Sequence, residues 1–258
     1  YTYGRNSPLQ YFEDDGPFGF YSIRDFALSA NRKNADPFYN MFVAYHNDPN
    51  YANTIISETL TGIGKWGQKS VEQRSAVITE TSAFMVLYMH LLGQMYGALN
   101  HCKGNAEEGG EYDLTHPWDE VAALLIGSLE GTSEGGSSDV QDGQLIWGLS
   151  TRRAFQFQTL NGQGYSKANS QLEDLLFAGR GELDALDCDA LSETVERVRQ
   201  LTLAPILQSV LRYGIQNEQH GADSTSEDLA LGETYALSVI PIIRSLDPAS
   251  AQIIEENM

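Results

Sequence analysis

The stretch VEQRSAVITETSAFMVLYMHLLGQMYGALN, residues 71–100, indicates the fold class most strongly. Its apolar residues recur three or four positions apart, which places them on one side of an α-helix. The residues on that side are Val77, Phe84, Leu87, Tyr88, Leu91, Leu92, Met95 and Leu99. The spacing predicts one long amphipathic helix that packs along the core of the protein.

Helical patterns also lie on either side of this stretch, and no strand-like alternation of useful length interrupts them. Prolines and glycines are predicted to end or break several of these helices, at Pro205, Pro241, Gly179 and Gly181. The predicted helices cover residues 22–30, 37–46, 51–60, 117–127, 144–157, 165–177, 191–216, 224–244 and 248–258. The sequence therefore predicts a mainly α protein, a single helical domain of several amphipathic helices with long irregular loops.

The chain is expected to begin with an irregular, aromatic-rich segment over residues 1–35, followed by the helical domain over residues 36–258. The boundary is marked by Asp36-Pro37, because proline suits the first turn of a helix. Gly-Pro breakers among aromatic residues in YFEDDGPFGF, residues 11–20, favour an irregular path pinned by its rings.

The composition excludes some classes of partner. With 16 Lys plus Arg against 35 Asp plus Glu, the formal net charge is −19, which repels nucleic acids and anionic membranes and attracts cations. No apolar run approaches the roughly 20 residues that a transmembrane helix needs, so no transmembrane segment is expected. The sequence has no HExxH or CxxC motif, and GKWGQK, residues 64–69, lacks the framing of a phosphate-binding loop. A non-enzyme is therefore expected.

The most chemically suggestive stretch is THPWDEVAALLIGSLEG, residues 115–131. Pro117 is expected at the first position of a helix, with His116 as its cap and Asp119 and Glu120 in its first turn. His116 and Glu120 are four residues apart, so they could reach one cation. The alternative is that the carboxylates stabilise the helix through its dipole and that His116 only caps it. The helix is predicted to end at Gly127 or Gly131.

Other polar residues leave two interpretations open. The pair Arg152-Arg153 could clamp a carboxylate, carbonate or phosphate, or form salt bridges in this acidic chain. Glu80 and His90, on the long helix, are functional candidates if buried and ordinary surface residues if not. The two cysteines, at positions 102 and 188, could form a disulfide or remain as buried thiols.

Several fragments of the chain resemble a family of algal low-iron-inducible proteins that includes the phytotransferrins. The fragments keep the order they have in that family and extend over about residues 36–258. They are DPFYNMF (36–42), HPWDE (116–120), IGSLEG (126–131), WGLSTRR (147–153), APILQSVLRY (204–213), SVIPII (238–243) and ENM (256–258). The chain is therefore similar to this family over most of its length.

The resemblance implies a secreted, periplasmic or cell-surface helical domain that binds Fe(III), with carbonate as synergistic anion. It implies metal ligands and anion partners only by analogy, at positions that fall in or near the matching fragments. The metal ligands would be His116, Asp119, Glu120 and Glu130, with Tyr213 as a further candidate, and the anion partner would be Arg153 or Arg212.

Cys102 and Cys188 match cysteine positions of the family, so the resemblance implies that they form a disulfide in an oxidising compartment. Ala154 stands where the family usually has another cysteine. The alternative function is a non-catalytic structural or assembly protein of the cell surface or of an extracellular polymer. Such a protein would self-associate or bind other cell-surface proteins through exposed aromatic patches.

Overall fold

The computed structural model describes residues 23–28, 37–104, 115–127, 145–220 and 227–258. These residues form a helical domain, and the β pairing within them is limited to an isolated antiparallel bridge between Leu160 and Ser166. The predicted mainly α fold class is confirmed. The predicted N-terminal segment, residues 1–35, lies outside the described residues except for 23–28, so the two-part division of the chain stays a prediction.

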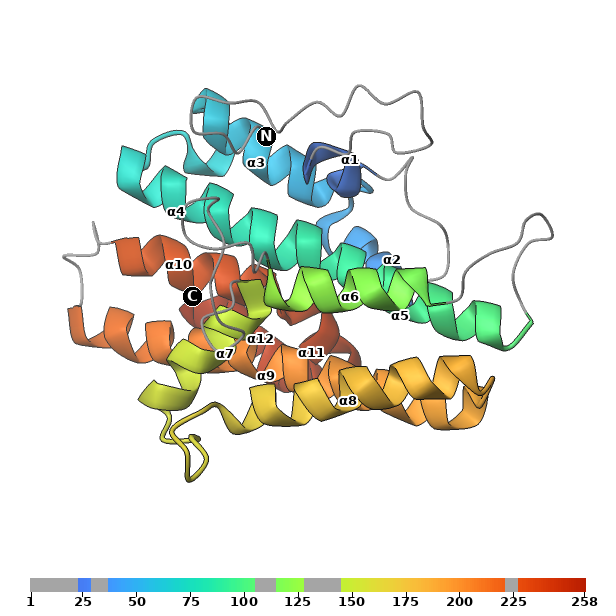
Figure 1. Ribbon diagram of the computed structural model, residues 1–258. Helices are drawn as coiled ribbons and strands as arrows, with labels where there is room; N and C mark the ends of the chain where they lie inside the picture. Colours follow the sequence, from blue (N-terminus) through green and yellow to red (C-terminus); the bar gives the residue numbers. More distant parts are fainter. Residues whose placement is uncertain (1–22, 29–36, 105–114, 128–144, 221–226) are drawn as a thin grey trace, which may run out of the picture.

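The elements follow one another along the chain with short connections where the structure describes them. They are α1 (Ile23–Ala27), α2 (Pro37–His46), α3 (Tyr51–Thr61), η2 (Gly64–Trp66), α4 (Val71–Thr81), η3 (Ser82–Leu87), α5 (Tyr88–Cys102), α6 (His116–Ile126), α7 (Leu145–Gln156), α8 (Lys167–Asp184), α9 (Cys188–His220), α10 (Glu227–Leu237), α11 (Ile240–Leu246) and α12 (Pro248–Asn257). In Figure 1, α3, α4 and α5 form the upper part of the bundle and α8 and α9 the lower part.

The long helix predicted over residues 71–100 is present as α4, η3 and α5, which follow one another without a break; η3 is a π-helical segment. Its N-terminus is closed by a capping box in which Ser70 and Gln73 exchange side-chain-to-backbone hydrogen bonds. Its apolar side lies in the core, as expected. Of the residues predicted on that side, all but Leu87 are buried: Val77, Phe84, Tyr88, Leu91, Leu92, Met95 and Leu99.

This helix, residues 71–102, is also long and apolar enough to cross a membrane by length and composition, and α10 with α11 passes the same test as a bent pair. More than half of the most apolar window of the long helix is buried inside the protein. Burial of this kind is typical of a core helix that packs against its neighbours.

Helix α9 is the second long helix, and it continues through Pro205, where the sequence predicted an interruption. That prediction is wrong because one proline removes only one helical hydrogen bond, whereas α9 packs against α5, α7, α8 and α10 along its length. The hydroxyl of Ser209 also donates a hydrogen bond of 2.7 Å to the carbonyl of Pro205. Tertiary packing thus overrides the local signal.

Helix α8 likewise continues through Gly179 and Gly181, where breaks were predicted. Gly179 is buried against the indole of Trp118, so this glycine serves close packing between helices rather than chain reversal. In contrast, the chain does break between α10 and α11, at residues 238–239 just before Pro241, with a bend of 46°. The prediction of a kink or break near Pro241 is confirmed.

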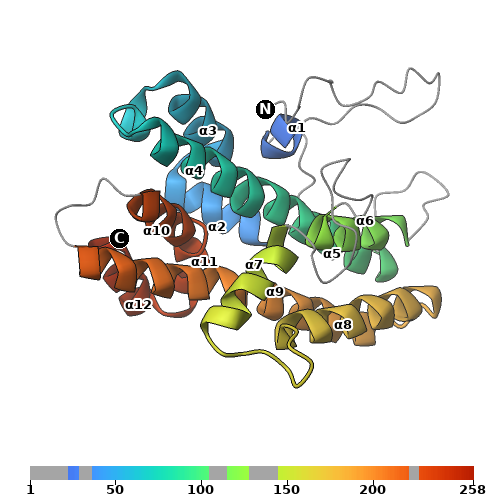
Figure 2. The ribbon, with the colours of Figure 1, turned by 60° about the vertical axis from the view of Figure 1, so that its left-hand side comes forward.

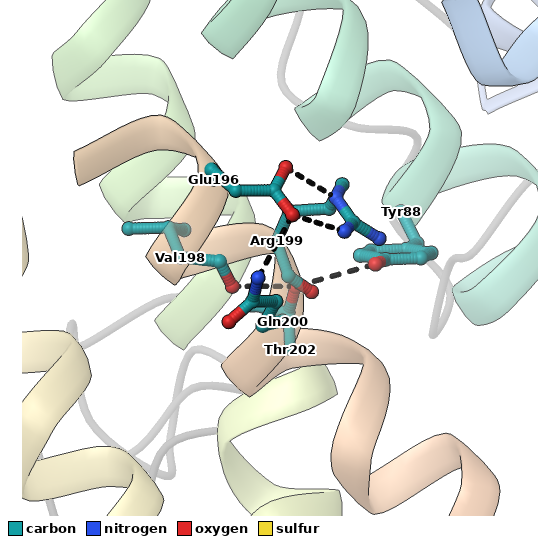
Figure 3. A network of polar contacts seen from close by, with 6 residues as sticks. All are labelled: Tyr88, Glu196, Val198, Arg199, Gln200 and Thr202. Atoms are coloured by element: carbon teal, nitrogen blue, oxygen red, sulfur yellow. Dashed lines mark hydrogen bonds and ion pairs between the residues drawn. The ribbon is translucent and has the colours of Figure 1, made fainter. Parts of the chain in front are cut away.

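Two contacts join the long helices. Cys102, at the end of α5, is bonded to Cys188, at the start of α9, which confirms the predicted pairing. Further along, the hydroxyls of Tyr88 and Thr202 are 3.2 Å apart in the core, and Arg199 is paired with Glu196 (Figure 3). The contact between Tyr88 and Thr202 fixes α9 against α5, whereas Arg199 and Glu196 pair within α9.

Candidate functional site

A cluster of polar side chains lies where α4, α7, α9 and α10 meet; Figure 2 shows α10 beside α9 and below α4. The cluster consists of Glu80, Arg153, Tyr213 and Tyr235, one from each helix, and we call it the tyrosine–arginine cluster. Arg153 and Tyr235 are only 3% and 2% exposed. A buried ionisable side chain needs a polar or charged partner. Each of these four side chains has a partner within the cluster.

Arg153 is the cation of the cluster. Its guanidinium carbon lies 5.3 Å from the ring centroid of Tyr213 and 5.9 Å from that of Tyr235, within the range of cation–π interactions. Its Nε donates to the hydroxyl of Ser209 at 2.7 Å and its Nη1 to the Gln156 side chain at 2.5 Å. A guanidinium carries five N–H donors, so donors remain for a bound oxyanion.

Tyr235 and Glu80 form the acidic side of the cluster. The hydroxyl of Tyr235 donates a hydrogen bond of 2.7 Å to Oε2 of Glu80. Burial, and then the negative charge of Glu80, raises the pKa of Tyr235 well above its usual value. Burial also raises the pKa of Glu80, although the hydrogen bond from Tyr235 and the nearby Arg152 and Arg153 charges oppose this shift. The phenol of Tyr235 therefore keeps its proton at neutral pH.

The donor set suits a hard cation. One carboxylate and two phenols are oxygen donors of the kind that ferric ion prefers, and a guanidinium is a cation that pairs well with an oxyanion. The rings of Tyr213 and Tyr235 are nearly parallel, at 10°, with centroids 5.6 Å apart. One turn further along α9, Nδ2 of Asn217 is buried with no hydrogen-bond partner within the described part of the chain. In residue type, these side chains are compatible with a ferric site with an anion.

The structure separates the ligands that the resemblance implied on α6. Thr115, not His116, is the N-cap of α6; His116 is the first helical residue and is exposed. The helix starts one residue early because Pro117 is accommodated in its first turn. It ends at Gly127, one of the two predicted ends. Glu130 lies outside the described residues.

The two first-turn carboxylates of α6 already have protein partners. Asp119 accepts from Nη1 of Arg180 at 2.5 and 2.6 Å, and Glu120 lies 3.0 Å from Nε2 of His90 and 2.5 Å from Nε2 of Gln94. Across the described ranges, no three His, Cys, Asp or Glu side chains are grouped so that they could hold a metal ion. His116, Asp119 and Glu120 are thus not brought to one centre.

Of the other candidates from sequence, the structure brings Tyr213 and Arg153 together, and no hydrogen bond or ion pair of the described residues joins Arg212 to them. Glu80, a candidate only if buried, is half-buried and belongs to the same cluster. Tyr235 and Ser209 were missed. Glu80 and Tyr235 are 155 positions apart, and no local pattern marks either of them as the partner of the other.

Comparison of this chain with protein-family models, curated proteins and solved structures finds no match.

Proposed function

We propose that this chain is a secreted or cell-surface protein that binds ferric iron for iron assimilation, with the tyrosine–arginine cluster as its site. Glu80, Tyr213 and Tyr235 would hold the ion, and Arg153 would hold carbonate as the synergistic anion. The observation that carries the proposal is that two tyrosine rings lie against one buried arginine and that one of these tyrosines donates a hydrogen bond to a carboxylate. The resemblance to algal low-iron-inducible proteins supports the same function.

The site also supports binding that depends on pH. Iron must displace the phenol proton of Tyr235, and the raised pKa values of Tyr235 and Glu80 make proton competition strong. Affinity for Fe(III) should therefore rise with pH, and acid should release the ion.

The test is to equilibrate the purified protein with ferric nitrilotriacetate, with and without bicarbonate, and to measure iron per chain by elemental analysis. A visible tyrosinate-to-iron charge-transfer band reports phenolate ligation directly. We expect about one iron per chain, dependent on bicarbonate. Tyr235→Phe and Tyr213→Phe should each reduce and shift the band and weaken binding, whereas Tyr165→Phe, at an exposed tyrosine, should change neither.

The variant His116→Ala separates this site from one on α6. Because His116 is exposed on a different helix, its loss should leave iron binding unchanged. Loss of iron in His116→Ala together with full binding in Tyr235→Phe would move the site to α6 and contradict the proposal. Circular dichroism of each variant shows whether the helical fold is retained.

A second candidate function is a structural or assembly protein of the cell surface. It is favoured by exposed apolar side chains on α9, where Leu211 and Ile215 lie one turn apart and are 59% and 55% exposed. The aromatic stretch of residues 11–20, the other expected contact, lies outside the described residues. No retained iron together with concentration-dependent self-association in analytical ultracentrifugation would favour this function over iron binding.

A further inference from the structure

A pocket lies between α6, α7 and α8. Glu80, Tyr213 and Tyr235 lie on other helices and do not line it. Its volume is about 330 Å³, which is within the size range of small-molecule sites. Its walls are mainly apolar and include three aromatic side chains, those of Trp118, Trp147 and Phe177. Phe177 is 75% exposed, so its ring is accessible from solvent.

The two tryptophans differ in their hydrogen bonding. The indole N–H of Trp118 donates to the carbonyl of Leu176 at 2.9 Å. Trp147 is 0% exposed, and its indole N–H has no partner among the residues that the structure describes. An unpaired buried donor is costly, by about 1–3 kcal/mol, so a donor next to a pocket points to a ligand that carries an acceptor.

Among the described residues, the charged groups that line the pocket leave one negative charge without a partner. Arg180 is paired with Asp119 through both carboxylate oxygens, so these two charges compensate each other. Glu173 also lines the pocket, and none of the hydrogen bonds or ion pairs of the described residues involves its carboxylate. The chain as a whole has a net charge of −19, which raises the local concentration of cations.

We propose that this pocket binds a small organic cation, an ammonium or quaternary ammonium that also carries an oxygen acceptor. The faces of Trp118, Trp147 and Phe177 would attract the cationic head, since aromatic rings and a carboxylate together recognise such groups. Glu173 would neutralise its charge. The acceptor oxygen of the ligand would accept a hydrogen bond from the indole N–H of Trp147.

The probe is choline, and its control is 3,3-dimethylbutan-1-ol, which has nearly the same shape and hydroxyl but no charge. Binding is measured by titration calorimetry and by quenching of tryptophan fluorescence, with the full chain and no added iron. We expect saturable choline binding that is about tenfold or more tighter than binding of the neutral analogue.

Substitutions test which side chains contact the bound choline. Glu173→Gln should weaken choline binding about tenfold, because it removes the charge and keeps the shape. Asp174→Asn is the matched control: it removes a charge from the neighbouring, exposed residue of α8 and should have little effect. Trp147→Phe should weaken binding of choline and of its neutral analogue alike, since both offer the hydroxyl.

Three results would overturn the proposal: no saturable choline binding, equal affinity for the neutral analogue, or equal losses in Glu173→Gln and Asp174→Asn. The last result would show attraction to the overall charge instead of a site. Because no iron is present and none of the three variants changes Glu80, Tyr213 or Tyr235, failure here leaves the ferric proposal in place. Failure of iron binding likewise leaves this one in place.

Discussion

His46 shows how burial of a single side chain makes stability depend on pH. Its ring stacks on that of Tyr51, with centroids 4.9 Å apart and an angle of 7°. Its Nε2 is buried with no hydrogen-bond partner in the described part of the chain. Burial therefore lowers the pKa of His46 from 6.5 to about 4, although the charge of Asp48 opposes the shift. The folded protein holds this imidazole neutral.

We expect His46 to weaken the fold as the pH falls. Below pH 6.5 the unfolded chain binds a proton that the folded chain binds only near pH 4, so stability that is fully present above 6.5 is lost between these values. The loss is at most about 3 kcal/mol. In His46→Phe, which keeps a stacking ring, the free energy of unfolding from urea titrations should fall less steeply between pH 6.5 and 4.

The matched control is His116→Phe, at an exposed histidine, which should keep the acid dependence of the unchanged protein. If His46→Phe and the unchanged protein lost stability in parallel over this range, the burial of His46 would not be its cause.

At the scale of elements, the packing of α6 against α8 depends on one glycine. A Cβ at Gly179 would lie 2.1 Å from Cζ2 of Trp118, much closer than real side-chain contacts allow. Trp118 is itself 1% exposed and is anchored to α8 by its hydrogen bond to Leu176. The indole cannot retreat without losing that bond, so the two helices can approach this closely only where α8 has no side chain.

We expect Gly179→Ala to destabilise the protein by about 1–3 kcal/mol, because the added methyl group overpacks the contact with Trp118. Thermal unfolding followed by circular dichroism, together with the near-ultraviolet signal of the tryptophans, measures the effect.

Gly181, two residues further along α8, is the matched control. It is exposed, and a Cβ there would meet no atom within 4 Å. Gly181→Ala should therefore leave the protein unchanged or stabilise it by about 0.5–1 kcal/mol through helix propensity. Equal effects of the two substitutions would mean that Trp118 does not limit the approach of α6 to α8.

At the scale of the whole molecule, the disulfide links two long helices that are far apart in sequence. Cys102 and Cys188 are separated by 86 positions, so the bond closes a long loop that includes α6, α7 and α8. In the chain-entropy model, closing a loop of this length lowers the entropy of the unfolded chain and stabilises the fold by about 4–5 kcal/mol. The bond also holds one end of α5 against the start of α9.

We expect the double variant Cys102→Ser, Cys188→Ser to lose about 4–5 kcal/mol of unfolding free energy in urea titrations. The unchanged protein in the presence of a reductant should lose the same amount, which serves as the control for the substitutions themselves. A loss below about 1 kcal/mol in both would show that the unfolded chain is already restricted without the bond.

The sequence by itself determined the helical class and most helix positions. These features depend on local signals: apolar spacing along 71–100, proline in first turns, and the glycine that ends α6. The local pair Arg152-Arg153 marked Arg153, and the resemblance added Tyr213. The spacing on α6 and the resemblance also gave His116, Asp119 and Glu120, which the structure does not bring to one centre.

Only the tertiary structure decided how distant side chains pair. Glu80 meets Tyr235, Asp119 meets Arg180, and Glu120 meets His90, although none of these pairs is local in the chain. It also decided that α8 and α9 continue through Gly179 and Pro205. The physical reason is that a helix forms through hydrogen bonds four residues apart. Its partners, and its tolerance of a glycine or proline, depend instead on the surfaces packed against it.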